Sequence, residues 1–258
     1  MESRRISGNR TAEDLVREYF IELNKTPSSE KDILEGGIGT AGSDKETKPK
    51  RTRKPRVKTT SIQGVNLSDY ILLPQHNLYV AKERTLQGKD WYKTQAAVHK
   101  QDARILNLRE FADFLLLLKS GNAEDGLGNK ISKLDLQTLY LDITEKRDPY
   151  RAEWLDAEFK DKNGNLHINY SHRFKGKKLT PLKSEPLETC VMKNCEVELS
   201  SFNKQGMPTK EGTDFNCWYP VDGRVAWFDA YAGRAGLYCD GYPDDSNGGL
   251  GVRVAREK

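Results

Sequence analysis

The chain has little of what marks several protein classes. Its 258 residues contain four cysteines, which are too few and too scattered for a disulfide scaffold. No run of about 18 apolar residues is present, so no transmembrane helix is expected. The charged start MESRRISGNR lacks the apolar stretch of a secretory signal. We therefore expect a protein of a reducing compartment, cytoplasmic by default, with any surface display arranged through a partner.

Recognisable catalytic and metal-binding patterns are also absent from the sequence. It contains no P-loop, no GxSxG and no HExxH motif. The four histidines do not cluster at metal-ligand spacing, and we interpret His167 and His172 as structural or surface residues. The sequence thus predicts no enzyme, no cofactor and no metal site.

The positive charge is concentrated in one segment. Residues 48–58, KPKRTRKPRVK, carry seven positive charges and no negative one, so removing them from the net charge of +4 leaves about −3. Such a run either binds nucleic acid by counterion release or forms a solvated linker. The sequence thus offers residues 48–58 as its only candidate for nucleic-acid binding, and a plain linker is the alternative.

The chain divides into an arm and a domain. Residues 1–60 form the arm, in which 11–24 read as a short amphipathic helix and 25–60 have the composition of a disordered linker. Residues 61–258, within a chain of 36% hydrophobic content, are long enough to bury a core. We expect them to form one ligand-binding domain.

Within the domain, helices come first and short strands follow. Residues 70–73 and 78–80 read as strands, and helices are predicted from Trp91 to Lys100, over 107–119 and over 133–143. Further helical material is expected around Tyr150–Leu155. Residues 156–202 alternate strands with Asn163–Gly164 and Lys175–Gly176 turns, and regular structure thins out after Ser200. This order indicates an α+β domain.

The last forty residues are aromatic and rich in Gly and Asp, with few Leu, Ile or Val. Aromatic side chains with polar tips, set among Gly, Asp and Asn, are typical of a recognition surface. They fill protein cores about as often. The tail ends in the strand-like run Gly251–Arg256.

Three short motifs carry a family resemblance. ARILNLREF (103–111), GRVAW (223–227) and GLGVRVAR (249–256) resemble, in order and spacing, segments of formylglycine-generating-enzyme-like proteins, a branch of the C-type-lectin fold. The same fold includes the variable proteins of diversity-generating retroelements. ITEKRDPYRAEWLDAEFK (143–160) and the layout of the tail are similar to archaeal members of that class.

The resemblance implies a fold, a function and a set of site residues. It implies a C-type-lectin-like fold with two main helices, a small mixed or antiparallel sheet and long C-terminal loops. The function would be non-catalytic binding of a protein or cell-surface ligand, through a retroelement-diversified surface within 227–250. The residues expected at that surface are Phe228, Asp229, Tyr231, Arg234, Tyr238, Asp240, Tyr242, Asp244, Asp245 and Asn247. The expected scaffold anchors are Trp218, Trp227, Gly223, Gly251 and Arg253.

Two other functions, cysteine oxidation and calcium-dependent binding, have some support in the sequence. Cys190 and Cys195 have the four-residue separation of the formylglycine-generating cysteine pair, which would make the chain a cysteine oxidase. The pair precedes Gly223 by about thirty residues, whereas in that family it follows the equivalent strand, so a structural thiol pair or a disulfide is favoured. Asp240, Asp244 and Asp245 could suggest calcium, but the motifs of sugar-binding C-type lectins are missing.

Overall fold

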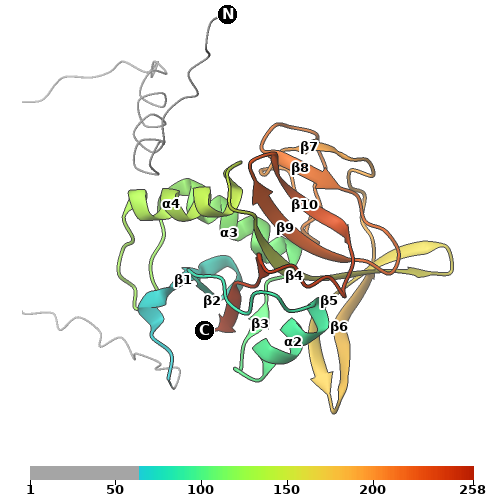
Figure 1. The fold of residues 1–258 in the computed structure, drawn as a ribbon, viewed down its shortest axis with the longest axis horizontal. Helices are drawn as coiled ribbons and strands as arrows, with labels where there is room; N and C mark the ends of the chain where they lie inside the picture. The colour runs from blue at the N-terminus through green and yellow to red at the C-terminus, as the bar shows by residue number, and fades with distance from the viewer. Residues whose placement is uncertain (1–63) are drawn as a thin grey trace, which may run out of the picture. The chain divides into compact units, whose positions relative to one another are not determined.

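The computed structural model describes residues 64–258, which begin with a small sheet joining distant parts of the chain. Its four strands, in the order β1-β2-β12-β3, are β1 (Tyr70–Leu73), β2 (Leu78–Ala81), β12 (Val254–Glu257) and β3 (Arg104–Ile105). β12 lies antiparallel between β2 and β3, so the closing strand holds the start of the domain in place (Figure 1). The predicted helix 11–24, the linker and the basic segment 48–58 lie outside the described residues.

Three α-helices follow the sequence predictions closely. They are α2 (Trp91–His99), α3 (Leu108–Ser120) and α4 (Lys133–Thr144). α3 begins with a capping box, in which Asn107 accepts from the backbone N–H of Glu110 while the Glu110 carboxylate accepts from that of Asn107. It ends at Gly121, whose φ of 65° suits a glycine. The helices predicted at these three places are confirmed.

A large sheet of eight strands dominates the domain. Its main path runs β6-β5-β4-β9-β10-β8-β7, and β11 (Leu250–Gly251) pairs with β4. The strands of the path are β4 (Arg151–Lys162), β5 (Asn165–Lys175), β6 (Lys178–Pro186), β7 (Cys195–Val197), β8 (Phe215–Trp218), β9 (Val225–Tyr231) and β10 (Arg234–Gly241). Most neighbours are antiparallel, and β8 and β10 pair in parallel.

The predicted fold class is therefore wrong. We expected two main helices, a small sheet and long C-terminal loops, but residues 64–258 contain an eight-stranded and a four-stranded sheet. The segment after Ser200, where we expected little regular structure, supplies β8 to β12. Its strands were hidden because small and polar residues replace the usual Val, Ile and Leu. Ala226, Ala230 and Ala235 fill buried strand positions.

The helical reading of Tyr150–Leu155 is also wrong, because β4 begins at Arg151. Its first seven residues are all buried, so the strand lacks the alternation of polar and apolar residues that predicts a half-exposed strand. The strands predicted within 156–202 are present as β5 and β6, and the predicted Asn163–Gly164 turn joins β4 to β5 with both residues at positive φ.

Two hydrophobic cores lie on opposite sides of the central strands. The larger core joins α3 and α4 to the side of β8, β9 and β10 that we call the inner face, and includes Phe111, Phe228 and Leu237. The smaller core contains Trp91, Trp154 and Leu250, with Trp227 packed against it. No helix in residues 64–258 has the length and apolar character needed to cross a membrane.

Candidate functional site

Strand alternation sorts the C-terminal strands into two chemically different faces. On the inner face, Phe228 packs its ring 5.3 Å from that of Phe111 and 5.2 Å from that of Phe215. Successive side chains of a strand point to opposite sides. The opposite, outer face therefore carries the polar and aromatic residues of the same strands. They are Asn216, Trp218, Trp227, Asp229, Tyr231, Arg234, Gly236 and Tyr238.

Aromatic rings and one guanidinium form a layer on the outer face. The Trp218 and Tyr238 rings stack with centroids 4.0 Å apart and planes 3° from parallel. The Arg234 guanidinium lies 4.6 Å from the Trp218 ring centroid, 5.3 Å from that of Tyr238 and 5.6 Å from that of Tyr231. Trp227 adjoins Tyr238 at 5.5 Å and links the layer to Trp154. Planar rings hold Arg234 through the attraction of a cation for their π faces.

Gly236 makes room for this stack. It is paired with Asn216 on β8 and with Asp229 on β9, in the middle of the outer face. A Cβ atom at this position would meet Trp218 Cζ3 at 2.6 Å and the Asn216 carbonyl oxygen at 2.9 Å. Glycine is thus required here because the Trp218 ring lies directly over the backbone.

Asp229 is the electrostatic centre of the outer face. Asp229 is only 5% exposed. Burial raises the pKa of its carboxyl to about 6, and this effect outweighs Arg234, Trp227 and Tyr150, which lower the pKa. Trp227 and Tyr150 act as nearby donors, yet Asp229 Oδ1 has no partner within hydrogen-bonding geometry. A hydrogen bond needs both distance and direction, so this oxygen is unpaired.

Four buried polar atoms of this face have no hydrogen-bond partner. They are Trp227 Nε1, Asp229 Oδ1, Arg234 Nε and Tyr238 OH. Only two other side-chain atoms in residues 64–258 share this condition, Gln95 Oε1 and Arg253 Nη2. Buried polar groups are normally paired, and each exception calls for an explanation. Here the exceptions gather on one face of two paired strands.

The predicted surface residues fall into three groups. Phe228 belongs to the inner core, so its assignment to the binding surface is wrong. Asp229 and Tyr238 lie on the outer face as expected but are buried rather than exposed. Tyr231, Arg234 and Asp240 are half-buried. The four exposed residues follow β10 in a loop and are Tyr242, Asp244, Asp245 and Asn247.

The predicted anchors also divide. Trp218 and Trp227 are half-buried rather than core residues, and both belong to the aromatic layer. Gly223 occupies the turn before β9 with φ of 74°. Gly251 is needed because a Cβ there would lie 2.9 Å from the Thr85 carbonyl oxygen. Arg253 is buried, lies 3.3 Å from Glu153 Oε2 and donates to the Ala81 and Lys82 carbonyl oxygens.

One contact of the exposed loop was missed from the sequence. The Arg224 guanidinium lies 3.4 Å from the centroid of the Tyr242 ring. Tyr242 is 57% exposed, so this cation–π pair is accessible at the surface. The GRVAW motif that contains Arg224 gave no signal for the contact, because the partner lies eighteen residues away.

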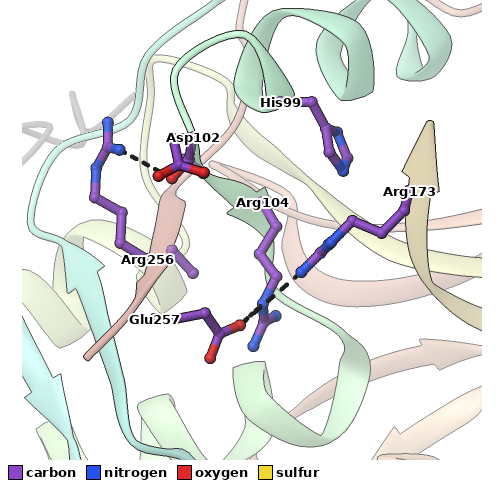
Figure 2. Close-up of a pocket in the computed structure, with 8 residues that line it drawn as sticks. His99, Asp102, Arg104, Arg173, Arg256 and Glu257 are labelled. Carbon is purple, nitrogen blue, oxygen red and sulfur yellow. Dashed lines mark hydrogen bonds and ion pairs between the residues drawn. The ribbon is translucent and has the colours of Figure 1, made fainter. Parts of the chain in front are cut away.

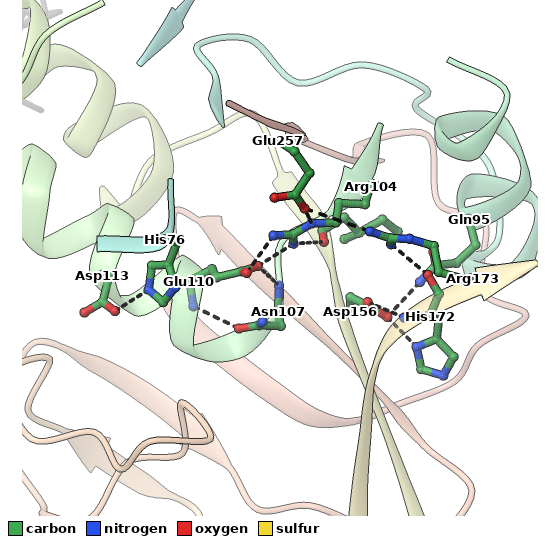
Figure 3. Close-up of polar contacts among 11 residues, drawn as sticks. His76, Gln95, Arg104, Asn107, Glu110, Asp113, Asp156, His172, Arg173 and Glu257 are labelled. Carbon is green, nitrogen blue, oxygen red and sulfur yellow. Dashed lines mark hydrogen bonds and ion pairs between the residues drawn. The ribbon is translucent and has the colours of Figure 1, made fainter. Parts of the chain in front are cut away.

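A second polar centre lies between α2, β4 and β5. Asp156 accepts hydrogen bonds from Gln95 Nε2 at 2.9 Å, from the His172 backbone at 3.0 Å and from His172 Nδ1 at 2.5 Å (Figure 3). His172 Nε2 lies 3.9 Å from Glu158 Oε2, which is within ion-pair range but too long for a hydrogen bond. Both Asp156 and His172 are buried.

The charges of this centre stabilise one another. Burial disfavours a charged imidazole, but the acids Asp156 and Glu158 outweigh it and raise the pKa of His172 to about 9. Burial would likewise raise the pKa of Glu158, but His172, Asn169 and Lys160 hold it at about 2. The contacts of His172 within residues 64–258 join α2, β4 and β5, so we infer that the group holds these elements together.

A small cavity of about 150 Å³ lies where β3, β5 and β12 meet (Figure 2). Arg104 in its wall donates to both carboxylate oxygens of Glu110, at 2.6 and 2.7 Å, and to Glu257 at 2.8 Å. Arg256 donates to the Gln101 and Asp102 carbonyl oxygens. These guanidinium groups are paired within the chain, so the cavity is a junction of strands rather than the best candidate site.

The cysteines do not form an activated pair. All four are free thiols, and Cys195 lies opposite Cys217 on neighbouring strands rather than beside Cys190. Burial raises the pKa of Cys190 to about 11, with the Cys217 thiol adding to the effect. A thiol of raised pKa stays protonated and is a poor nucleophile.

Within residues 64–258, no group of three or more His, Cys, Asp or Glu side chains is arranged to hold a metal ion. The outer face therefore remains the strongest candidate site, through its aromatic layer and its unpaired polar atoms. No family model matches the chain, and comparisons with curated proteins and with solved structures likewise find no match.

Proposed function

We propose that the chain is a non-catalytic ligand-binding protein whose binding surface is the outer face of β8, β9 and β10. The observation that carries this proposal is the gathering of four unpaired buried polar atoms on that face. A buried polar group without a partner costs about 1–3 kcal/mol. Trp227 lies near Asp229 as a donor, which offsets part of this cost. Four such groups on one face of β9 and β10 still suit a surface completed by a ligand.

The chemistry of the face defines the kind of contact it offers. Trp227 Nε1 and Arg234 Nε are donors, Asp229 Oδ1 is an acceptor when ionised, and Tyr238 OH is both. The Trp218–Tyr238 stack beside them presents a flat apolar surface. Aromatic anchors with a charged group at their centre are typical of hot spots in protein recognition. We therefore favour a protein or another cell-surface molecule with both apolar and polar groups.

All four atoms are buried, and three of them belong to side chains of the aromatic layer itself, so binding requires a side chain to move. Arg234 is the best candidate, because it is half-buried and is held by rings rather than by an ion pair. Rotation of its side chain away from Trp218 would open the Asp229 carboxylate to a ligand. The exposed residues from Tyr242 to Asn247 would extend the contact along the adjoining loop.

The resemblance to retroelement variable proteins gives this surface a further proposed property, diversification. The two faces of β9 and β10 support it, because outer side chains such as Tyr231 and Arg234 can change without altering the inner core. The DNA around the gene tests the proposal. A near-identical downstream repeat that differs at adenines, next to a reverse transcriptase gene, would support it; absence of the repeat would contradict it.

Peptide selection tests the binding surface itself. A phage-displayed library of random peptides is panned against the whole chain, and the strongest peptides are measured by fluorescence anisotropy. We expect the peptides to lose at least tenfold in affinity with Trp218→Ala and with Arg234→Ala, since hot-spot truncations cost about 2 kcal/mol or more.

Tyr92→Ala is the matched control. Tyr92 is 48% exposed on α2, outside the outer face, and it is an aromatic residue that could also attract peptides. Peptides that lose affinity with the Tyr92 variant and keep it with the Trp218 and Arg234 variants would place the preferred surface elsewhere. For the alternative cysteine oxidase, the decisive result would be an oxidase activity that disappears with alanine at Cys190 or Cys195.

A further inference from the structure

The far part of the β5–β6 hairpin is a two-stranded ribbon. β5 pairs with β4 only over Asn165–Asn169, whereas its pairing with β6 continues to Lys175 opposite Lys178. Beyond Asn169, β5 therefore has a strand neighbour on one side only. Figure 1 shows the ribbon projecting from the large sheet beside α2, and the Phe174 ring contacts His99 of that helix at 5.5 Å.

The ribbon carries charge of one sign. The segment 173–183, RFKGKKLTPLK, contains five basic residues and no acidic one. Arg173 lies 3.9 Å from Glu257 Oε1, and Lys183 lies over the Tyr170 ring at 5.5 Å. The three lysines of the tip, Lys175, Lys177 and Lys178, are exposed, and none has an acidic partner in residues 64–258.

The tip breaks a rule of strand pairing. Lys175 and Lys178 are directly opposite each other, and the turn between them places Lys177 next to both. Like charges at opposed positions of an antiparallel pair destabilise it. Gly176, at φ of 63°, satisfies the turn, so backbone geometry does not require lysine at the flanking positions. The repulsion between these lysines lowers stability, and no contact within the ribbon offsets it. Such a feature indicates that the lysines bind something outside the chain.

Protection of a sheet edge explains only part of this pattern. β6 is an edge strand, and lysine and proline on edge strands prevent unwanted pairing. Pro181, Pro186 and Lys183 already serve that purpose on β6. The other edge of β5 is also open beyond Asn169, so Lys175 can protect that edge, but Lys177 lies in the turn and is not needed to block either edge.

We propose that the tip of the β5–β6 ribbon binds the phosphate backbone of duplex nucleic acid. A two-stranded ribbon fits the major groove of B-form DNA, which is about 12 Å wide. Lysines on both strands and in the turn can then neutralise phosphates on both sides of the groove, which releases counterions. The polar tip argues against a membrane, because the exposed apolar residues Phe174 and Leu182 lie behind the lysines.

Salt dependence measures this contact in the full chain. The affinity for a short fluorescein-labelled DNA duplex of mixed sequence is followed by anisotropy between about 50 and 200 mM KCl. Each lysine–phosphate contact contributes about 0.9 to the slope of log affinity against log salt. Replacing Lys175, Lys177 and Lys178 with Gln should therefore lower that slope by about 3. Lys177→Glu alone should lower it by at least 1, and serves if the triple variant does not fold.

Two further variants separate the ribbon from other basic sites. Gln at Lys100, Lys130 and Lys133 removes three exposed lysines elsewhere and should leave the slope unchanged. Gln at all seven basic positions of 48–58 removes the arm's charges, and the ribbon substitutions should lower the slope by the same amount in that background. An unchanged slope for the ribbon variants there would overturn the proposal. Equal competition by polyglutamate, or equal binding to phosphatidylserine vesicles, would also overturn it and assign the tip to another acidic surface.

Discussion

Asp156 and Asp229 are both buried aspartates on neighbouring strands, yet their surroundings differ completely. Asp156 is 1% exposed and accepts three hydrogen bonds, two of them from the backbone and the ring of His172. Asp229 is 5% exposed, has one oxygen without a partner, and has a pKa raised to about 6. Asp156 thus forms a buried ion pair with His172, whereas Asp229 lacks a hydrogen-bond donor for one of its oxygens.

This contrast separates structural from functional polarity in one sheet. A buried charge that is paired and hydrogen-bonded holds elements together, as Asp156 does for α2, β4 and β5. A buried carboxyl that is left incomplete lowers stability, and such costs are typical of functional sites. The His172 centre would attract attention in a search for catalytic residues. Only Gln95 Oε1 is unpaired there, however, whereas four unpaired buried polar atoms of residues 64–258 lie on the outer face.

The largest effect is expected at Asp156. Asp156→Asn leaves the His172 imidazolium buried without its main counter-charge, so the free energy of unfolding should fall by about 3–5 kcal/mol at pH 7. Urea denaturation measures the change. A loss below about 1 kcal/mol would mean that Asp156 is not a completed structural pair, and the contrast with Asp229 would fail.

A pH titration of stability should show the His172 pair directly. The folded pKa of about 9 exceeds the ordinary value of 6.5, so the pair stabilises fully below pH 6.5 and is lost as the pH rises through 9. The loss should be about 3 kcal/mol. Denaturation of the wild type and of His172→Gln at intervals from pH 6 to 10 tests this, because the variant should lack the decline in that window.

Asp229 should also lose stability as the pH rises, but in a lower pH window and because its charged form is the unfavourable one. Its folded pKa of about 6 exceeds the ordinary 3.8, so the ionised carboxylate lowers stability above pH 6 and has no effect below about pH 3.8. Asp229→Asn should therefore raise the free energy of unfolding by about 2–3 kcal/mol at pH 8 and leave it nearly unchanged at pH 3.5. The exposed Asp244→Asn is the control and should change neither value.

The smallest change in the free energy of unfolding is expected at Gly236, which lies against the Trp218 ring. Gly236→Ala places a methyl group 2.6 Å from Trp218 Cζ3, and such overpacking costs about 1–3 kcal/mol. Tryptophan fluorescence should shift as Trp218 moves away from Tyr238. Gly248→Ala is the matched control, since nothing lies within 4 Å of its added Cβ. Equal results for the two variants would show that Trp218 is not held over Gly236.

Sequence patterns predicted the parts of the fold that depend on local signals. The capping residues Asn107 and Gly121 define α3, and the Asn163–Gly164 turn marks the β4–β5 hairpin. The large sheet was missed because its strands carry unusual residues. β4 is buried along both faces, and the inner positions of β9 and β10 include alanines that give no apolar run.

The sequence predicted which side chains belong to the candidate site better than it predicted where they lie. Asp229, Tyr231, Arg234 and Tyr238 were selected for their side chains, and strand alternation then places them on one face. Phe228 was included as part of the segment 227–250, but strand alternation directs its side chain into the core. The pairing of Asp156 with His172 depends on the register of β4 and β5, which no sequence spacing shows.

Stability and binding measured together on Asp229→Asn test the central claim most directly. The claim is that the outer face carries an incomplete polar site whose partner is a ligand. We predict that this variant gains stability at pH 8 and loses at least tenfold in affinity for the peptides selected against the whole chain. A variant that loses stability, or that gains stability and keeps full affinity, would contradict the assignment of Asp229 to a ligand site.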